Sequence, residues 1–286
     1  MKNLLLPIVL AFTLTSYAQE AQSGPSSRYF KVVPISEAHQ TFGHPQEQSL
    51  DPKSINVLIW NIKKSLVIGW EEEFNYYGKN QDLFLLQEAY ENDIFLNTLN
   101  SFRNIRWDMG RSFLYRAYGD TATGNMIGSE VAPSEFIVRH SPNREPVTNT
   151  PKAMTIGSYP VGNKTHVLVI SIHGINFNSN AAFRRHMEQA AEEIRKHSGP
   201  VIFAGDFNTH TNGRESYLYQ LAEELGLYEV EFKNSEYRTR APVTGNFFDH
   251  AFVRGLKVTY AEVMKESLAS DHRPMKLSLA LVGQKN

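Results

Sequence analysis

Four nearly continuous apolar runs of strand length constrain the fold of this chain more than any other feature. They lie at residues 56–60, 83–86, 166–172 and 201–204. A strand can be apolar along its whole length only when both faces of its sheet are covered, as in α/β proteins. The run at 275–282 instead alternates leucines with polar residues, which predicts a strand covered on one face.

Helical patterns separate some of these runs, and weaker strand patterns fill other gaps. Residues 181–196 follow Asn178-Ser179-Asn180, which can cap a helix, and residues 214–225 end at Gly226, a common helix stop. Three further strands are predicted, at 134–138, 152–156 and 248–253. Helices and strands interleave without a regular β-α-β order, which favours a layered α/β fold with mixed sheets.

The chain has 286 residues, a net charge of −1 and no cysteine. The absence of cysteine excludes disulfides, thiolate catalysis and cysteine-ligated zinc. A near-neutral net charge argues against a protein that binds nucleic acid over its whole surface, and it leaves open a local basic groove. Several arginines cluster in sequence, and surface solvation is their expected role: Arg103, Arg106, Arg111, Arg116, Arg139 and Arg144.

The chain divides into three expected parts. Residues 1–18 are similar to a secretory signal, because Lys2 precedes a short apolar stretch and Ser16-Tyr17-Ala18 offers a cleavage point; a single anchoring helix is the alternative. Residues 19–53 are polar and are expected to form an N-terminal arm or linker, and residues 54–286 one domain. The mature protein is expected to be exported, periplasmic or secreted, as a monomer without stable membrane insertion.

A polar side chain follows each of the four continuous runs, and others precede later strands. In chain order these residues are Asn61, Glu88, His173, Asp206 with Asn208, Asp249 and the pair Asp271-His272. If the strands at 248–253 and 275–282 run antiparallel to the other four, all of these side chains reach one rim of the sheets. Such a rim suits a catalytic site, because rigid strands hold the side chains while solvent reaches them.

Each of these residues also has a simpler explanation. The simpler roles are a turn residue for Asn61 and Asp206, an exposed carboxylate for Glu88, a core histidine for His173, and pairing with Arg254 or His250 for Asp249. Their recurrence beside strands in one order favours a shared site over six separate coincidences.

The motif series resembles that of the endonuclease/exonuclease/phosphatase superfamily, which includes DNase I, neutral sphingomyelinases and inositol-polyphosphate 5-phosphatases. The motifs are Trp60-Asn61, Leu86-Gln87-Glu88, Ile172-His173, Gly205-Asp206-Phe207-Asn208, Phe248-Asp249-His250 and Ser270-Asp271-His272. The likeness runs from about residue 55 to 282. It implies a DNase I-like four-layer α/β/β/α sandwich with two mixed β-sheets.

A closer likeness is to a bacterial branch, the YafD-like proteins, and it brings no assigned substrate. The segments that carry it are Arg144-Glu145-Pro146, Thr150-Pro151-Lys152-Ala153 and His173-Gly174-Ile175-Asn176-Phe177. Lys152 and Arg144 are the candidate phosphate contacts, with surface solvation as the alternative for Arg144.

The superfamily resemblance implies a role for each polar residue. Asn61, Glu88 and Asp271 would hold a divalent ion, Mg²⁺ or Mn²⁺, which prefers hard oxygen ligands. His272 would activate water, oriented by Asp249, since an aspartate can fix the tautomer of a histidine that titrates near neutrality. The remaining catalytic residues would be His173, facing the phosphoryl oxygens, and Asp206 and Asn208, lining the other side of the site and able to hold a second ion.

These roles predict a divalent-metal-dependent phosphoesterase, most specifically a phosphodiesterase or nuclease acting on a phosphate ester such as nucleic acid. A phospholipase C or sphingomyelinase type and a soluble phosphomonoesterase are the alternatives within this chemistry. The first of these would need exposed aromatic residues near the rim. A catalytically inactive binding module is the alternative of another class, disfavoured because every expected polar position is filled.

Overall fold

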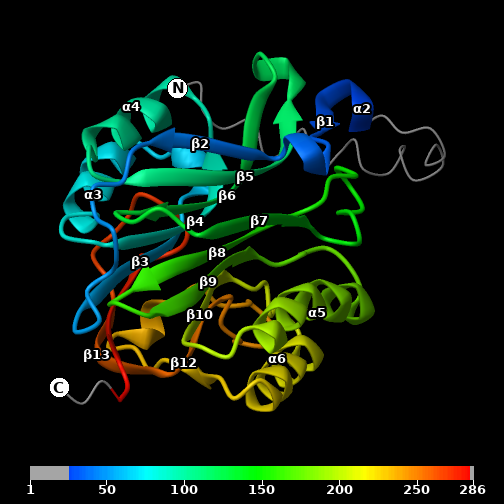
Figure 1. Cartoon of the computed structure of the whole chain (residues 1–286). Helices are drawn as coiled ribbons and strands as arrows, with labels where there is room; N and C mark the ends of the chain where they lie inside the picture. Colours follow the sequence, from blue (N-terminus) through cyan, green and yellow to red (C-terminus); the bar gives the residue numbers. More distant parts are fainter. Residues whose placement is uncertain (1–25, 284–286) are drawn as a thin grey trace.

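Alternate side chains of the central strands face opposite sides, and this alternation builds the layers of the protein. Along β3 (Ile55–Asn61), Val57 and Ile59 pack between two sheets, whereas Leu58 and Trp60 pack beneath helices. The computed structural model describes residues 26–283. It shows two face-to-face sheets with helices on both outer faces (Figure 1).

The first sheet has eight strands and is mixed. Besides β3 it contains β1 (Phe30–Val32), β2 (His39–Gly43), β4 (Leu83–Tyr90), β5 (Arg106–Tyr115), β6 (Thr121–Ser129), β13 (Leu256–Val263) and β14 (Met275–Leu281). Their order is β1-β5-β6-β4-β3-β14-β13, and β2 also pairs with β5. β3 and β4 run parallel, and the other pairs are antiparallel.

The second sheet has six strands in the order β11-β12-β10-β9-β8-β7. These strands are β7 (Glu135–His140), β8 (Ala153–Val161), β9 (Thr165–His173), β10 (Val201–Asp206), β11 (Tyr228–Glu229) and β12 (Asp249–Arg254). β9 and β10 run parallel, and the remaining pairs are antiparallel. The inward faces of the two sheets share one apolar core, as expected for a sandwich.

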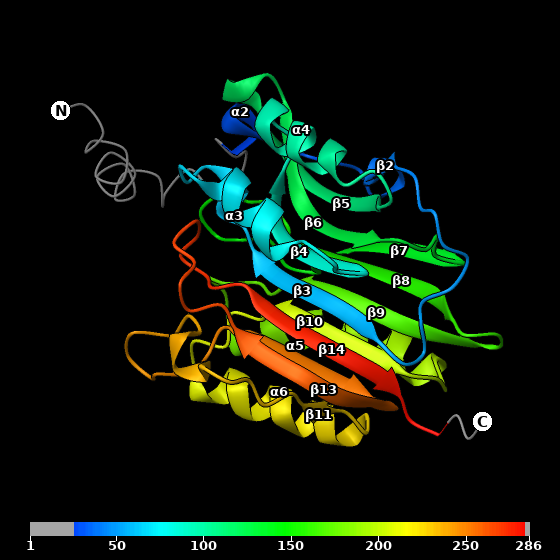
Figure 2. The same ribbon diagram turned by 90° about the vertical axis from the view of Figure 1, so that its left-hand side faces the viewer.

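Helices cover the outer faces of both sheets (Figure 2). α3 (Trp70–Tyr77) and α4 (Asp93–Ser101) pack on the first sheet, and α5 (Asn180–Lys196) and α6 (Asn212–Glu224) pack on the second. Ser179 caps α5 by accepting a hydrogen bond from the N–H of Ala182, as the sequence predicts. The predicted four-layer α/β/β/α sandwich with two mixed sheets is confirmed.

The N-terminal part of the described chain joins the first sheet. Residues 26–53 form α2 (Ser26–Tyr29), η1 (Ile35–Glu37), β1 and β2, and both strands pair with β5. The predicted signal at residues 1–18 lies outside the described residues. Within 26–283, helices long and apolar enough to cross a membrane are absent.

The strand directions gather the predicted functional residues at one end of the sandwich. β12 runs antiparallel to β10, and β14 runs antiparallel to β3. The starts of β12 and β14 therefore lie at the same end of the sandwich as the finishes of β3, β4, β9 and β10. The sequence predicts a common rim if these two strands run antiparallel to the other four, and the structure has this arrangement.

Candidate active site

The strand register places three functional side chains in one row at the rim of the second sheet. His173 ends β9 and pairs in register with Asp206, which ends β10. Asp206 pairs in turn with Asp249, the first residue of β12. All three side chains are buried. Because adjacent strands lie about 4.8 Å apart, side chains in this row can interact directly.

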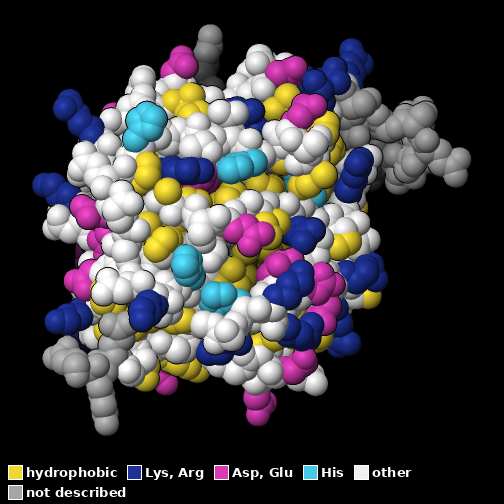
Figure 3. Space-filling view, in the orientation of Figure 1, with side chains coloured by type: hydrophobic (Ala, Val, Ile, Leu, Met, Phe, Trp, Pro, Cys, Tyr) yellow, Lys and Arg dark blue, Asp and Glu magenta, His cyan; other side chains and the backbone are white. Residues whose placement is uncertain are grey.

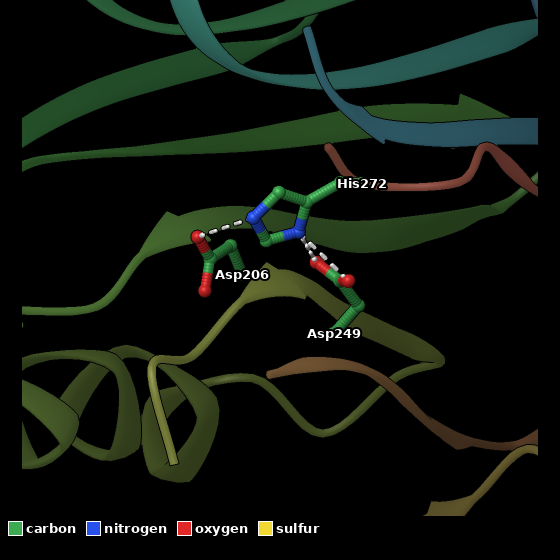
Figure 4. A group of neighbouring side chains, drawn as sticks. All are labelled: Asp206, Asp249 and His272. Carbon is green, nitrogen blue, oxygen red and sulfur yellow. Dashed lines mark hydrogen bonds and ion pairs between the residues drawn. The ribbon is translucent and has the colours of Figure 1, made fainter. Parts of the chain in front are cut away.

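His272 joins this row from the loop that precedes β14. Its Nδ1 lies 2.9 and 2.8 Å from the two carboxylate oxygens of Asp249, and its Nε2 lies 3.8 Å from Oδ2 of Asp206. Figure 4 shows the imidazole between the two carboxylates. The indole N–H of Trp60 donates to the His272 carbonyl over 2.9 Å, which ties this loop to β3.

Arg254 and His250, the alternative partners of Asp249 in the sequence, bind other groups. Arg254 donates to the carbonyls of Leu225 and His197, and Nδ1 of His250 lies 2.7 Å from Glu229. The side chain of Asp249 is therefore directed to His272, and the pairing with Arg254 or His250 is wrong.

Asp206 connects this row of side chains to the first sheet through a hydrogen bond. Nδ2 of Asn61, the last residue of β3, donates to Oδ2 of Asp206 over 3.0 Å. Nε2 of His173 lies 3.6 Å from the same oxygen. Burial raises the pKa of Asp206 to about 6; His272 opposes this rise, and the negative charge of Asp249 adds to it.

The two histidines of the site have opposite protonation preferences. Burial lowers the pKa of His272, but Asp249 and Asp206 outweigh burial and raise that pKa to about 10. Burial, and next the charge of Lys152, lower the pKa of His173 well below its usual value. Nζ of Lys152 lies 3.0 Å from Nε2 of His173. With the charges of the protein alone, His272 is charged and His173 is neutral at pH 7.

Glu88 lies at a β-bulge inside β4, not beyond the end of the strand as its sequence pattern suggests. The register between β4 and β6 shifts between Leu86 and Ala89, and Glu88 has a φ of +56°. A non-glycine residue in this left-handed region is strained, and such strain concentrates at functional sites. The bulge turns a carboxylate out of a strand that is otherwise buried.

The carboxylate of Glu88 forms an ion pair with Lys64. Burial raises the pKa of Glu88, but Lys64, His173 and Lys152 together outweigh burial and lower it to about 2. Burial lowers the pKa of Lys64, but Glu88, Tyr115 and Asp271 outweigh it and raise that pKa. Lys64 therefore lies within electrostatic reach of both Glu88 and Asp271.

A short strained turn supplies this lysine. η2 (Lys63–Ser65) follows β3 directly, and its three residues have φ values of +47°, +62° and +53°. Nζ of Lys63 lies 3.2 Å from the Asp271 carboxylate. Two adjacent lysines thus neutralise two of the carboxylates that the resemblance assigns to a metal. Neither lysine is marked by the sequence patterns.

The donors around Lys64 suit a hard divalent cation. Glu88 and Asp271 offer carboxylate oxygens, which magnesium and manganese prefer. Asn61 pairs in register with Gln87, the residue before Glu88, so its amide lies on the neighbouring strand. The ammonium group of Lys64 already places a positive charge beside Glu88, which shows that a cation is stabilised here.

A second group of possible metal ligands already makes contacts within the protein. The ligand atoms of Asp206, Asp249 and His272 lie within 4.8 Å of one another. However, both oxygens of Asp249 already contact Nδ1 of His272. The oxygens of Asp206 also accept hydrogen bonds, Oδ2 from Asn61 and Oδ1 from the Asn208 N–H, so both carboxylates of this group are already engaged.

Arg214 fixes the two loops that follow His173 and Asp206. Its guanidinium is fully buried and donates to four carbonyls, those of Ile175, Asn176, Asn178 and Asn208. Asn208, at a φ of +54°, donates its backbone N–H to Oδ1 of Asp206 over 2.9 Å and its amide to the Gly174 carbonyl. Asn208 and Arg214 are thus positioning residues, and the sequence marks Arg214 only as a helix start.

Glu145 fixes the loop after His173 from the other side. Its buried carboxylate accepts the N–H groups of Asn176 over 2.7 Å and of Phe177 over 2.9 Å. Arg144, beside it, is exposed, and its carbonyl accepts a hydrogen bond from Asn178. The structure therefore brings Lys152 to His173 and leaves the Arg144 side chain on the surface of the same loop.

The comparisons with known proteins agree with this geometry. Residues 54–272 match the model of the Endonuclease/Exonuclease/phosphatase family. A UPF0294 protein of Vibrio parahaemolyticus is 33% identical over 232 residues, covering 81% of this chain and 79% of that protein. A UPF0294 protein of Vibrio cholerae is 30% identical over 243 residues, covering 84% and 83%.

The fold is also similar to that of a solved endonuclease/exonuclease/phosphatase from Beutenbergia cavernae. The TM-score is 0.63 at 16% identity, over 81% of this chain and 72% of that one. The predicted resemblance, including the closer bacterial branch, is confirmed. The chain belongs to the endonuclease/exonuclease/phosphatase family.

Proposed function

We propose that the protein is a divalent-metal-dependent phosphodiesterase in which a histidine-activated water attacks phosphorus. The observation that carries this proposal is the position of His272 between Asp249 and Asp206 (Figure 4). The family unites endonucleases, exonucleases and phosphatases, all of which act on phosphate esters, and membership supports this reaction class.

His272 is the residue best placed to accept the proton of the attacking water. Its Nδ1 is committed to Asp249, so Nε2 is the atom that can take a proton. Asp249 holds the ring and stabilises the imidazolium that forms. The charges of the protein alone raise the pKa of His272 to about 10, so the role of a base requires this pKa to fall toward neutrality.

The proposed cation ligands are Glu88, Asp271 and Asn61. When bound, a Mg²⁺ or Mn²⁺ ion would neutralise the charge of the phosphate and, as a positive charge near His272, favour the neutral imidazole. Glu88 is ionised at neutral pH, because its pKa is lowered to about 2. Lys64 has to move from Glu88 to admit the ion.

The phosphate is proposed to lie against His173 and Lys152. The ammonium group of Lys152 supplies positive charge and donates to Nε2 of His173, which leaves the Nδ1–H of the neutral ring as the donor for a phosphoryl oxygen. Asp206, with a pKa raised to about 6, can hold a proton near neutrality. Arg144 is proposed as an outer contact for a larger substrate. Cleavage of residues 1–18 and export as a monomer belong to this proposal.

The test is hydrolysis of bis(p-nitrophenyl) phosphate by the purified mature protein. We expect turnover with Mg²⁺ or Mn²⁺ and its loss in excess EDTA. His272→Ala serves as the matched control, because it should leave metal binding in place and abolish turnover. Equal rates with and without the chelator would contradict the role of the metal. Hydrolysis of phosphomonoesters but not of the diester would contradict the proposed phosphodiesterase activity.

A further inference from the structure

We infer that the phosphodiester substrate is a phospholipid in a membrane surface, and that exposed apolar loop tips around the active site enter that surface. This inference rests on the proposed function and names its substrate class. The loop tips belong to separate segments at one end of the sandwich. They are Leu66, Ile68, Tyr118, Val147, Phe177, Val243 and Leu268.

The topology places all of these tips around the active site. Residues 62–69 follow β3, 141–152 precede β8, and 174–179 follow β9. Residues 264–274 precede β14 and contain Asp271 and His272. The hairpin tip formed by η3 (Arg116–Tyr118) joins β5 to the start of β6, which pairs with the end of β4. Figure 1 shows this hairpin beside α2.

The remaining tip, Val243, reaches the same end from the turn before β12. Thr244, next to it, donates to the carbonyl of His210, in the loop that follows Asp206. The hairpin of β5 and β6 is likewise tied to the site, because Tyr115 is close enough to Lys64 for each to shift the pKa of the other. Each tip therefore lies on a segment that also carries or contacts a site residue.

These apolar side chains have almost no shielding from water. Ile68 is 100% exposed, Val243 96%, Leu268 71% and Phe177 70%. Single exposed apolar residues are ordinary on a protein surface. What needs an explanation is that four of the five most exposed large apolar side chains of residues 26–283 lie on separate loops around the candidate site; the fifth, Tyr76, lies on α3.

Polar contacts to the backbone hold two of the loops that carry these side chains. Glu145 holds the backbone of Phe177. Glu73 of α3 accepts the N–H of Leu268 over 3.1 Å, so this loop is fixed to the helix that follows Ile68. Apolar tips on fixed supports are ready to enter a lipid surface without first being ordered, which lowers the entropic cost of binding.

The charges around the site fit a zwitterionic head group better than a nucleic acid. A polyanion requires unpaired cations along its path. On the strands that reach this end of the sandwich, Arg111 pairs with Glu91, and Arg139 pairs with Glu193. The face in Figure 3 also shows positive and negative side chains interleaved over α5 and α6. At the rim, Lys63 and Arg116 alternate with exposed acids such as Glu71 and Asp120.

The same geometry selects the bond that breaks. In an in-line displacement, the leaving oxygen lies opposite the attacking water. His272 activates the water from inside the site, so the leaving oxygen points to the rim, where the acyl chains lie. The water oxygen adds to phosphorus, the bond from phosphorus to the diacylglycerol oxygen breaks, and that oxygen takes up a proton. The products are diacylglycerol and the head-group phosphate.

The experiment uses vesicles of palmitoyl-oleoyl phosphatidylcholine and the double variant Ile68→Ser/Val243→Ser. Sedimentation with the vesicles measures binding, and release of phosphocholine measures hydrolysis. Val282→Ser is the matched control, because Val282 is 66% exposed and follows the opposite end of β14. We expect the double variant to lose about tenfold or more in both measurements. Its rate on soluble bis(p-nitrophenyl) phosphate should stay within about twofold of wild type.

The binding measurement needs no turnover, so the two proposals fail separately. If wild type binds vesicles but hydrolyses neither substrate, the proposed function fails and the membrane surface stands. If the soluble diester is hydrolysed while vesicles are neither bound nor cleaved, the lipid inference fails. Faster cleavage of plasmid DNA, unchanged in the double variant, would assign a nucleic acid instead.

Discussion

Nδ1 of His272 contacts both carboxylate oxygens of Asp249, at 2.9 and 2.8 Å, while Nε2 of the same ring lies 3.8 Å from Asp206. One nitrogen is fixed by a buried carboxylate, and the other faces the residue that meets Asn61 and His173. The ring therefore has one orientation and one nitrogen free for proton transfer. This relationship connects residues that lie 23 positions or more apart in the chain.

Replacing His272 by Ala is expected to lower the rate of diester hydrolysis at least about 10²-fold, because general base catalysis is lost. Asp249→Asn should also lower the rate, because an amide cannot stabilise the imidazolium. Steady-state rates with Mg²⁺ measure both effects. Circular dichroism and thermal unfolding of each variant provide the control for folding. A near-wild-type rate for His272→Ala would remove this residue from the mechanism.

The stability of the protein in EDTA should fall as pH rises from about 6.5 to 10. The pKa of His272 is raised from 6.5 to about 10 in the folded protein, so its contribution to stability is full below pH 6.5 and is lost as pH rises through 10. The slope is at most about 1.4 kcal/mol per pH unit. Asp206, with a pKa of about 6, is already ionised over most of this range.

Urea unfolding at several pH values measures this slope, and NMR titration of the His272 ring measures the pKa directly. Asp249→Asn should lower the ring pKa and flatten the slope, because the negative charge that raises this pKa most is gone. A ring that titrates near its ordinary value in the wild-type protein would contradict the prediction.

If Glu88 holds the ion as proposed, Lys64→Met should tighten the binding of Mn²⁺ about tenfold, because the ammonium group of Lys64 occupies the Glu88 carboxylate. The same variant should be less stable than wild type in EDTA, by about 1 kcal/mol, because the partly buried carboxylate of Glu88 loses its ion-pair partner. Calorimetric titration with Mn²⁺ and urea unfolding measure the two effects.

Lys79→Met is the control for this variant, since Lys79 is exposed and lies before β4 at the end opposite the site. Glu88→Gln should instead weaken Mn²⁺ binding by tenfold or more. An unchanged Mn²⁺ affinity in both Lys64→Met and Glu88→Gln would reassign the cation site.

Arg214→Met should destabilise the protein by about 3 kcal/mol or more, because four buried carbonyls lose their donor. The loops after His173 and Asp206 would loosen, so the hydrolysis rate should fall as well. Urea unfolding checks the stability. Arg185→Met is the control: Arg185 is exposed and donates to Asn143, and its loss should change stability by less than about 0.5 kcal/mol. Equal stability of the two variants would show that Arg214 does not stabilise the loops after His173 and Asp206.

The central strands could be predicted from the sequence because burial on both faces leaves a continuous apolar run. β3, β9 and β10 lie within a few residues of their predicted bounds. β5, β6 and β13 lack such a run: β6 is rich in small and polar residues, and β13 carries Lys257 and exposed residues on one side. α3 and α4 are short, which leaves little room for a helical period.

The candidate site could be predicted as far as its acidic and histidine residues, because these follow or precede recognisable strands. The bulge at Glu88 could not, since a change of register depends on the partner strand. Lys64 and Arg214 could not be predicted either. Each is one of 29 lysines and arginines. Only tertiary contacts show that Lys64 reaches the partly buried carboxylate of Glu88 and that Arg214 donates to four carbonyls.

The position of a bound Mn²⁺ ion tests the central claim most directly. Anomalous diffraction from crystals soaked in MnCl₂ locates the ion without reference to activity. The account predicts a Mn²⁺ ion in contact with the Glu88 carboxylate, with the ammonium group of Lys64 moved away from it and the contact between His272 and Asp249 intact. A Mn²⁺ ion held between Asp249 and His272, with Lys64 still on Glu88, would contradict it.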